Sequence, residues 1–224
     1  MFVLALDTTT RGGSCAVAKD GIVLRERTGD PERPHDARLP GDLMALLDEE
    51  RIDVRDIDVY AVATGPGSFT GLRIGIATMQ GLAFAAGKPL VGVSGFDALA
   101  RVARAASVAT WVDAWRGEVF AARYEHGREV EPPTVEKPAA LLARISAPTV
   151  FIGDAASVYA DVIVGMLGDL AGLARPAAPP LAATIAEMAA RSALAGDCPG
   201  PDDIRPLYVR RPDAELARNA RPIA

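Results

Sequence analysis

Apolar and polar residues alternate near the start of the chain in a pattern typical of a β-meander. Residues 2–7 form a short apolar run, and residues 14–19 and 22–28 alternate. Asp20 and Gly21 separate the two alternating runs. An Asp-Gly pair in that setting is a strong hairpin signal, because both central positions of the turn favour positive φ. The pattern predicts three consecutive strands.

The apolar spacing then becomes helical over residues 37–51, with leucines gathered on one face. Pro40 falls in the first turn of this predicted helix, where its missing N–H is tolerated. The leucines of that face are Leu39, Leu43, Leu46 and Leu47. A strand at 59–63, a long small-residue helix at 69–86 and a strand at 90–93 follow. Ser94 is a candidate N-cap for a further helix that extends to about residue 106.

The second half of the chain is again predicted to be a mixture of strands and helices. Strands at 108–113 and 118–125 flank a predicted hairpin turn at 114–117. Helices are expected at 138–145, from about 155 and at 181–195, with a strand at 149–152. This order favours an α/β fold of two lobes, residues 1–106 and 107–224, in which the terminal segment can return to the first lobe.

A glycine-rich turn between a strand and a helix is the most informative motif. A helix that begins after such a turn could bind phosphate through its free backbone N–H groups. The glycine spacing, however, matches neither a Walker A loop nor a dinucleotide-binding loop. The turn consists of Gly65, Pro66, Gly67, Ser68, Phe69 and Thr70.

The helix that follows the turn contains glycines, each of which costs roughly 1 kcal/mol of helix propensity relative to alanine. Small residues at helical spacing let another backbone approach closely. The approaching element could belong to the core of the same chain or to a second subunit, and the sharper hypothesis is an interface with another subunit. The positions assigned to it on this helix are Gly71, Arg73, Ile74, Gly75, Thr78, Gly81 and Ala85.

A second polar motif, Asp7-Thr8-Thr9-Thr10, ends the first strand. In a kinase-like fold, a carboxylate and hydroxyls at this place could face a metal-bound phosphate. They could equally form a local turn in which the hydroxyls bond the backbone. Both interpretations stay open at the level of sequence.

Composition excludes several classes of function. The formal net charge of −5 does not favour independent nucleic-acid binding. Cys15 and Cys198 fit neither a disulfide framework nor a zinc site, and Cys15 is expected to be a buried apolar residue in a protein of the reducing cytoplasm. His35 and His126 cannot form a helical metal pair, so no metal site is expected. The start of the chain reads as a core strand and not a signal peptide, and no apolar run is long enough to cross a membrane.

A serine-hydrolase site is also disfavoured. The stretch from Gly92 to Phe96 resembles a nucleophile elbow, but its second glycine comes one place early. Near the C-terminus, a group of arginines could form a small basic patch or a solvated terminal segment. These arginines are Arg205, Arg210, Arg211, Arg218 and Arg221.

The string GPGSFTGLRIG at residues 65–75 closely resembles the hallmark of the TsaB (YeaZ-like) family. The opening LALDTTT, the His35 to Ala37 segment, the VDA and RGEV stretches near residue 115, and PLYVR at 206–210 resemble further family landmarks in the same order. The resemblance therefore spans most of the chain. Asp36 and Trp115 depart from the residues more usual in the family.

The resemblance implies a two-lobed actin/sugar-kinase/Hsp70-like (ribonuclease H-like) fold, with mixed sheets flanked by helices. It implies a non-catalytic scaffold that pairs with TsaD, and with TsaE, when threonylcarbamoyl is transferred to adenosine 37 of tRNAs reading ANN codons. Pairing would use helices of the first lobe, including Leu39, Leu43 and Leu46, and the same surface would form a homodimer when the protein is alone. No cofactor of its own is implied; ATP would act only in the complex with TsaD and TsaE, and tRNA would be met only there.

Two other functions remain as alternatives. A kinase-like ATP-binding enzyme would place Asp7 and Thr8 to Thr10 at the phosphates as a vestigial or working site. The sequence has neither the nucleophile motif nor the metal motif that a peptidase would need.

The second hairpin is surrounded by three carboxylates, Asp113, Glu118 and Glu125. Carboxylates beside a turn are usually solvated.

Overall fold

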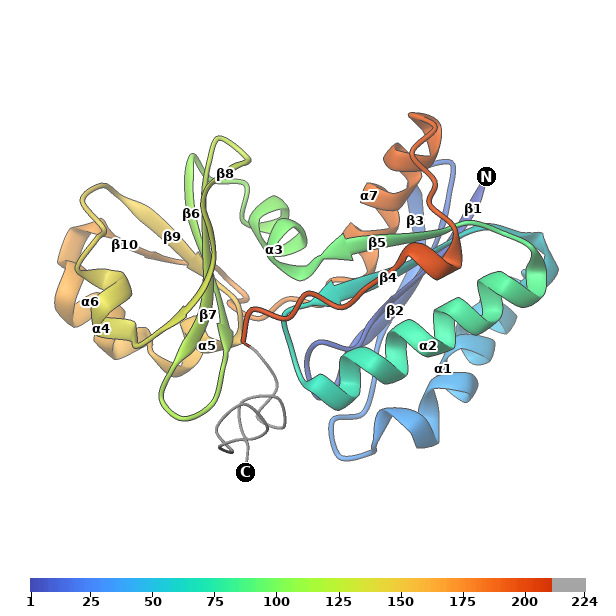
Figure 1. The fold of residues 1–224 in the computed structure, drawn as a ribbon, viewed down its shortest axis with the longest axis horizontal. Coiled ribbons are helices and arrows are strands. Elements are labelled where there is room, and N and C mark those ends of the chain that lie inside the picture. The colour runs from blue at the N-terminus through green and yellow to red at the C-terminus, as the bar shows by residue number, and fades with distance from the viewer. Residues whose placement is uncertain (211–224) are drawn as a thin grey trace, which may run out of the picture.

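The computed structural model describes residues 1–210, which form two lobes that each contain a five-stranded mixed sheet (Figure 1). The first sheet has the order β3-β2-β1-β4-β5. Its first three strands pair in antiparallel fashion, and β4 and β5 extend it in parallel with β1. The strands are β1 (Phe2–Asp7), β2 (Ser14–Lys19), β3 (Ile22–Thr28), β4 (Ile57–Gly65) and β5 (Leu90–Ser94).

The second sheet repeats this arrangement with the order β10-β9-β6-β7-β8. Strands β6, β7 and β8 form an antiparallel meander, while β9 and β10 are parallel to β6. Both predicted hairpins are confirmed, and Asp20 and Gly21 have the positive φ that the first turn requires. The strands are β6 (Ser107–Asp113), β7 (Val119–Glu125), β8 (Arg128–Glu136), β9 (Thr149–Ile152) and β10 (Ala171–Leu173).

Helices cover the sheets in layers. On one face of the first sheet, α1 (His35–Glu50) and α2 (Phe69–Ala86) lie side by side (Figure 1). On its other face lie α3 (Gly95–Ala103) and α7 (Ala182–Leu194), which share a core with the inner face of the second sheet. The outer face of the second sheet is covered by α4 (Pro138–Leu142), α5 (Asp154–Val158) and α6 (Ala160–Leu167). Three short 3-10 helices are η1 (Val54–Asp56), η2 (Gly168–Leu170) and η3 (Pro201–Asp203).

Alternation along β1 explains how one strand serves two cores. Val3 and Ala5 point into the core with α3 and α7, whereas Leu4 and Leu6 point into the core with α1 and α2. Successive side chains of a strand project to opposite faces of a sheet. The apolar run at the start of the chain is therefore a strand that is buried on both sides.

The chain returns to the first lobe at α7. Residues 107–224 are predicted to form the second lobe, with a return of the terminal segment to the first. The return begins at α7, which packs on β1, β2 and β4. The side chain of Ser14 on β2 accepts hydrogen bonds from the backbone N–H groups of Leu181 and Ala182, at 3.2 and 3.0 Å, and Glu26 on β3 accepts from Ala183 at 2.8 Å. The first turn of α7 is thus capped by strands of the first sheet, because residues at a helix start need external acceptors.

Residues 199–210, here called the C-terminal strap, connect the two lobes (Figure 1). The Gln80 side chain on α2 donates to the Pro201 carbonyl at 2.8 Å, and the Leu207 N–H donates to the Thr64 carbonyl at 2.7 Å. Arg210 then donates to the Ala114 carbonyl at 2.9 Å in the second lobe. Arg211, Arg218 and Arg221 of the basic group lie outside the described residues.

Candidate functional site

The glycine-rich motif is shaped by its contact with the loop that follows β1. A methyl group at Gly67 would lie 2.6 Å from the Thr9 carbonyl oxygen, and one at Gly71 would lie 2.6 Å from the Thr8 carbonyl oxygen. At Gly75 a methyl group would overlap Thr8 Oγ1. Glycine is required where a backbone comes this close. The motif therefore seats α2 against the Thr8–Thr9 loop of the same chain.

This contact corrects part of the predicted interface. Gly71 and Gly75 are buried, and their missing side chains are explained inside the molecule and not by a second subunit. Leu39, Leu43 and Leu46 are also buried, in the core between α1 and the first sheet. A periodic stripe shows which face of a helix packs, but the sequence does not say what it packs against.

The rest of the predicted interface does lie on the surface. Arg73, Gly81 and Ala85 are exposed, and Ile74 and Thr78 are partly exposed. They lie on the side of α2 that points away from the first sheet. Nothing in the described residues comes within 4 Å of a methyl group placed at Gly81. The glycine at this position has no internal packing reason.

Exposed apolar side chains extend this outward side of α2 onto its neighbour. Phe84 on α2 is 73 % exposed and Met44 on α1 is 47 % exposed. Beside Met44, the α1 residues Ala37 and Gly41 are also exposed. We call this surface the outward α1/α2 face: Ala37, Gly41, Met44, Arg73, Ile74, Ala77, Thr78, Gly81, Phe84 and Ala85.

The polar Asp7 to Thr10 segment divides between the interior and a cleft. Asp7 and Thr8 are buried, whereas Thr9 and Thr10 border a cavity of about 350 Å³ between the lobes. The Asp7 carboxylate accepts a hydrogen bond from the Thr9 N–H at 2.9 Å. Burial raises the pKa of Asp7, against the lowering effect of the hydrogen bonds from Thr9, and Asp154 across the cleft adds to the rise.

Both lobes contribute to the wall of this cavity. From the first lobe come residues 31–35, Arg11, and the motif residues Gly67 and Ser68. Ser68 caps α2, since its Oγ accepts from the Gly71 N–H at 3.3 Å. From the second lobe come Val112, Asp113, Trp115 and Asp154.

Asp113 and Asp154 organise the second-lobe side of the cleft. Asp154 accepts a hydrogen bond from the Asp113 N–H at 2.9 Å, and Asp113 in turn accepts from the Trp115 N–H at 2.9 Å. Burial raises the pKa of Asp154 despite these backbone hydrogen bonds. The expectation that carboxylates beside this hairpin are solvated holds for the exposed Glu125 but not for Asp113, which is half-buried.

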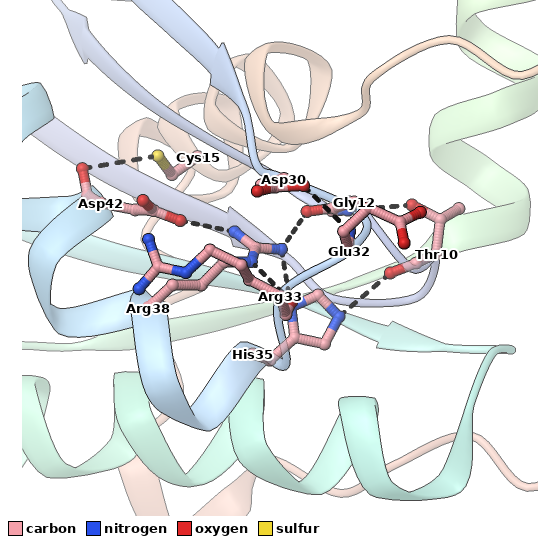
Figure 2. A network of polar contacts seen from close by, with 10 residues as sticks. Thr10, Gly12, Cys15, Asp30, Glu32, Arg33, His35, Arg38 and Asp42 are labelled. Atoms are coloured by element: carbon pink, nitrogen blue, oxygen red, sulfur yellow. Dashed lines mark hydrogen bonds and ion pairs between the residues drawn. The ribbon is translucent and has the colours of Figure 1, made fainter.

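A buried arginine beside the cleft joins α1 to the loop after β1 (Figure 2). Arg38 donates to the Asp42 carboxylate and to the Gly12 carbonyl, and its Nη2 lies 2.9 Å from Nδ1 of His35. His35 Nε2 lies 3.1 Å from the Thr10 carbonyl oxygen, so Nε2 carries the proton and Nδ1 accepts from Arg38. Burial and then Arg38 lower the pKa of His35.

Sequence reasoning missed this network. Arg38 and Asp42 are four residues apart in a helix, a spacing that indicates an ion pair. Sequence spacing does not reveal that Arg38 is buried, because charged residues of an amphipathic helix normally face water. Cys15 lies beside the network, 4.0 Å from the Asp42 carbonyl, and burial raises the pKa of its thiol to about 11. Its expected burial is confirmed.

Residues 1–210 contain no group of three or more His, Cys, Asp or Glu residues arranged to hold a metal ion. None of their helices has the length and apolar character needed to cross a membrane.

Comparison with known proteins places the chain. Residues 29–217 match the protein family described as TsaD, tRNA N6-adenosine threonylcarbamoyltransferase. The crystal structure of YeaZ from Pseudomonas aeruginosa superposes with a TM-score of 0.75 at 29 % identity, covering 92 % of this chain and 99 % of that one. The chain belongs to the TsaB (YeaZ-like) branch of the TsaD family. The expected fold of two lobes, with mixed sheets flanked by helices, is confirmed.

Two relatives illustrate the range of this branch. The Escherichia coli K12 tRNA threonylcarbamoyladenosine biosynthesis protein TsaB is 38 % identical over 142 residues, which are 58 % of this chain and 61 % of that protein. An uncharacterised protein of Mycobacterium tuberculosis H37Rv is 34 % identical over 215 residues, which are 95 % of this chain and 93 % of that protein. The TsaB-like chain is thus similar along nearly its whole length to a mycobacterial relative.

Proposed function

We propose that this chain is a non-catalytic scaffold subunit that pairs with TsaD, and with TsaE, in the formation of N6-threonylcarbamoyladenosine at position 37 of tRNAs reading ANN codons. Relatives from Escherichia coli, Bacillus subtilis and Haemophilus influenzae carry the name tRNA threonylcarbamoyladenosine biosynthesis protein TsaB. Membership of the same branch supports a role in that modification.

The outward α1/α2 face is the observation that carries the proposal. Two large apolar side chains, Phe84 on α2 and Met44 on α1, are exposed, and Gly81 on α2 has open space around it. An exposed apolar patch on a soluble protein indicates an interaction site. Small residues on a helix surface let a second helix approach closely, so the face fits helices of another subunit.

The same face supports a homodimer when the chain is alone, because a two-fold contact can use one patch on both copies. A single patch cannot hold two occupants at once. TsaD would therefore compete with the second copy, and the pair would form at the expense of the homodimer.

The rest of the assembly follows from charge and chemistry. With a net charge of −5, the chain lacks the basic surplus that RNA binding by itself would need, so tRNA is met through the complex. ATP is assigned to the assembled complex and not to this chain alone. Two free cysteines fit the reducing cytoplasm.

Reconstitution tests the proposal directly. Purified TsaD and TsaE, with TsaC to supply threonylcarbamoyl-adenylate, are incubated with tRNA in the presence and absence of this chain. Modified adenosine is then measured in digested tRNA. We expect modification that depends on the chain, while the chain alone produces none. Equal modification with and without the chain would refute the scaffold role.

A kinase-like ATP-binding enzyme remains the second candidate, and the cavity between the lobes favours it. Its volume of about 350 Å³ lies in the range of small-molecule sites, and Thr9, Thr10 and Ser68 line it. Calorimetric titration of the isolated chain with ATP and Mg²⁺ separates the candidates. Stoichiometric tight binding or turnover would favour the enzyme, and the scaffold proposal predicts neither.

A further inference from the structure

Helix α2 has one charged side chain among its 18 residues, Arg73, and that side chain lies on the outward α1/α2 face. Its neighbours along the helix on that face are Ala77, Gly81 and Phe84. A partner that covers these apolar and small residues must also cover Arg73. The chemistry around Arg73 therefore bears on what the partner has to supply.

Two aromatic rings hold the guanidinium of Arg73 in a fixed place. The Phe69 and Tyr208 rings stack with centroids 5.5 Å apart, and the Arg73 guanidinium carbon lies 4.0 Å from the Phe69 centroid. Arg73 Nε donates to the Tyr208 hydroxyl at 3.0 Å. Tyr208 belongs to the C-terminal strap, so the cluster joins segments 135 residues apart in sequence. We call Phe69, Arg73 and Tyr208 the arginine–aromatic cluster.

The terminal nitrogens of Arg73 are left without a partner within residues 1–210. Its single hydrogen bond there is the one from Nε, and no carboxylate of these residues lies in ion-pair range. Arg210, at the end of the strap, differs. Its guanidinium is occupied by the Ala114 carbonyl and the Glu118 carboxylate. Among residues 1–210, the terminal nitrogens of Arg73 are therefore available as a fork of N–H donors.

Such a fork matches one class of group. An arginine fork binds a carboxylate through two parallel hydrogen bonds, and a guanidinium that is already held loses little rotamer freedom on binding. Burying a cation without an opposite charge is costly, so a surface that covers Arg73 favours an acidic residue opposite it. Arginine, tyrosine and other aromatic residues are also the types that dominate binding energy at interfaces.

We propose that the arginine–aromatic cluster is the receptor for one Asp or Glu side chain of the partner subunit that docks on the outward α1/α2 face. The inference rests on the proposed pairing with TsaD. It adds that the contact has a single ionic anchor at the Phe69 end of α2, while the other residues of the face are uncharged.

Binding of TsaD to variants of the full-length chain tests the anchor. Arg73→Met keeps the length of the aliphatic stem and removes the fork, and we expect affinity to fall about 10- to 100-fold, as for the loss of a hydrogen bond between charged groups. Arg73→Lys keeps the charge but not the fork, and its affinity for TsaD should lie between those of the wild type and Arg73→Met. Tyr208→Phe keeps the stacked ring, removes the acceptor for Nε, and should lose about 2- to 10-fold.

Controls separate the anchor from the proposed function. Arg101→Met removes an exposed arginine on α3 and should bind TsaD as the wild type does. Unchanged affinity of Arg73→Met, with wild-type binding intact, would overturn the anchor alone. Absence of wild-type binding would instead overturn the pairing. A loss that appears only when tRNA is present would assign the fork to an RNA phosphate and overturn the carboxylate. Thermal melts confirm that each variant is folded.

Discussion

Thr8 illustrates how a single residue accounts for much of a motif. Thr8 is buried. Its carbonyl oxygen would collide with a methyl group at Gly71, and its hydroxyl would collide with a methyl group at Gly75. The Thr8 hydroxyl has no hydrogen-bond partner within the described residues. The two glycines and the threonine therefore form one packing unit, so close packing against Thr8 explains these glycines of the motif.

Two glycines of one helix should consequently respond in opposite ways to alanine. Gly75→Ala places a methyl group against Thr8, and overpacking of this kind costs about 1–3 kcal/mol. Gly81→Ala meets open space and should raise stability by about 1 kcal/mol through helix propensity. Urea or thermal unfolding monitored by circular dichroism measures both. Shifts of equal sign would contradict the assigned roles.

His35 should make stability depend on pH. Its pKa is lowered below the usual 6.5, so the folded protein disfavours the imidazolium. Unfolded chains then take up the proton first, and the contribution of His35 to stability is complete above about pH 6.5 and is lost as the pH falls through that value toward the folded pKa. The charges that face the ring are Arg38, Asp36 and Asp42.

A His35→Gln variant isolates this effect, because the carboxylates with raised pKa values are common to both proteins. Unfolding free energies of the wild type and the variant are compared between pH 5 and pH 8. We expect the wild type to lose stability relative to His35→Gln as the pH falls below about 6.5. A constant difference across this range would show that burial and Arg38 do not lower the pKa of His35.

At the scale of elements, sequence patterns predicted more of the fold than of the site. The β-meander, both hairpins and the helix from Phe69 to Ala86 follow from local spacing and turn residues, because such signals need only neighbours in the chain. The placement of α7 does not, since its cap, Ser14, lies 167 residues away from Leu181. The inward direction of Gly71 was missed for the same reason: the atom it meets belongs to a distant loop.

The C-terminal strap is an element held by side chains at a few points. Arg210 donates to Ala114 and to Glu118, and its guanidinium lies over the Phe120 ring at 5.6 Å. Arg210→Met should release the end of the strap from the second lobe. We expect faster amide hydrogen exchange over residues 205–209, with little change in β1, since local opening is governed by local contacts.

A matched control for the strap is Arg205→Met. Arg205 is exposed and, within the part of the chain that the structure describes, donates only to carbonyls of its own turn, those of Asp202 and Ile204. Exchange at Leu207, whose N–H donates to the Thr64 carbonyl, serves as the reporter. If Arg210→Met and Arg205→Met give the same exchange rate there, the strap is not fixed by its contact with the second lobe.

For the molecule as a whole, two lobes enclose a cleft, and the outward α1/α2 face is one of the surfaces on which large apolar side chains are exposed. On its inward side, the start of α2 packs closely against Thr8 and Thr9 through its glycines. The opposite side of α2 carries exposed Phe84 and an unfilled Gly81. This contrast supports a protein that acts by pairing.

Sedimentation velocity of the chain with TsaD, using Gly81→Leu beside Gly81→Ala, tests that claim most directly. Gly81 is exposed, and no described residue packs within 4 Å of a methyl group at this position, so we expect the isolated chain to accept both side chains. We predict that Gly81→Leu keeps the wild-type melting behaviour but no longer forms the heterodimer, whereas the smaller Gly81→Ala retains measurable pairing. A well-folded Gly81→Leu variant that pairs with TsaD at unchanged affinity would contradict the account.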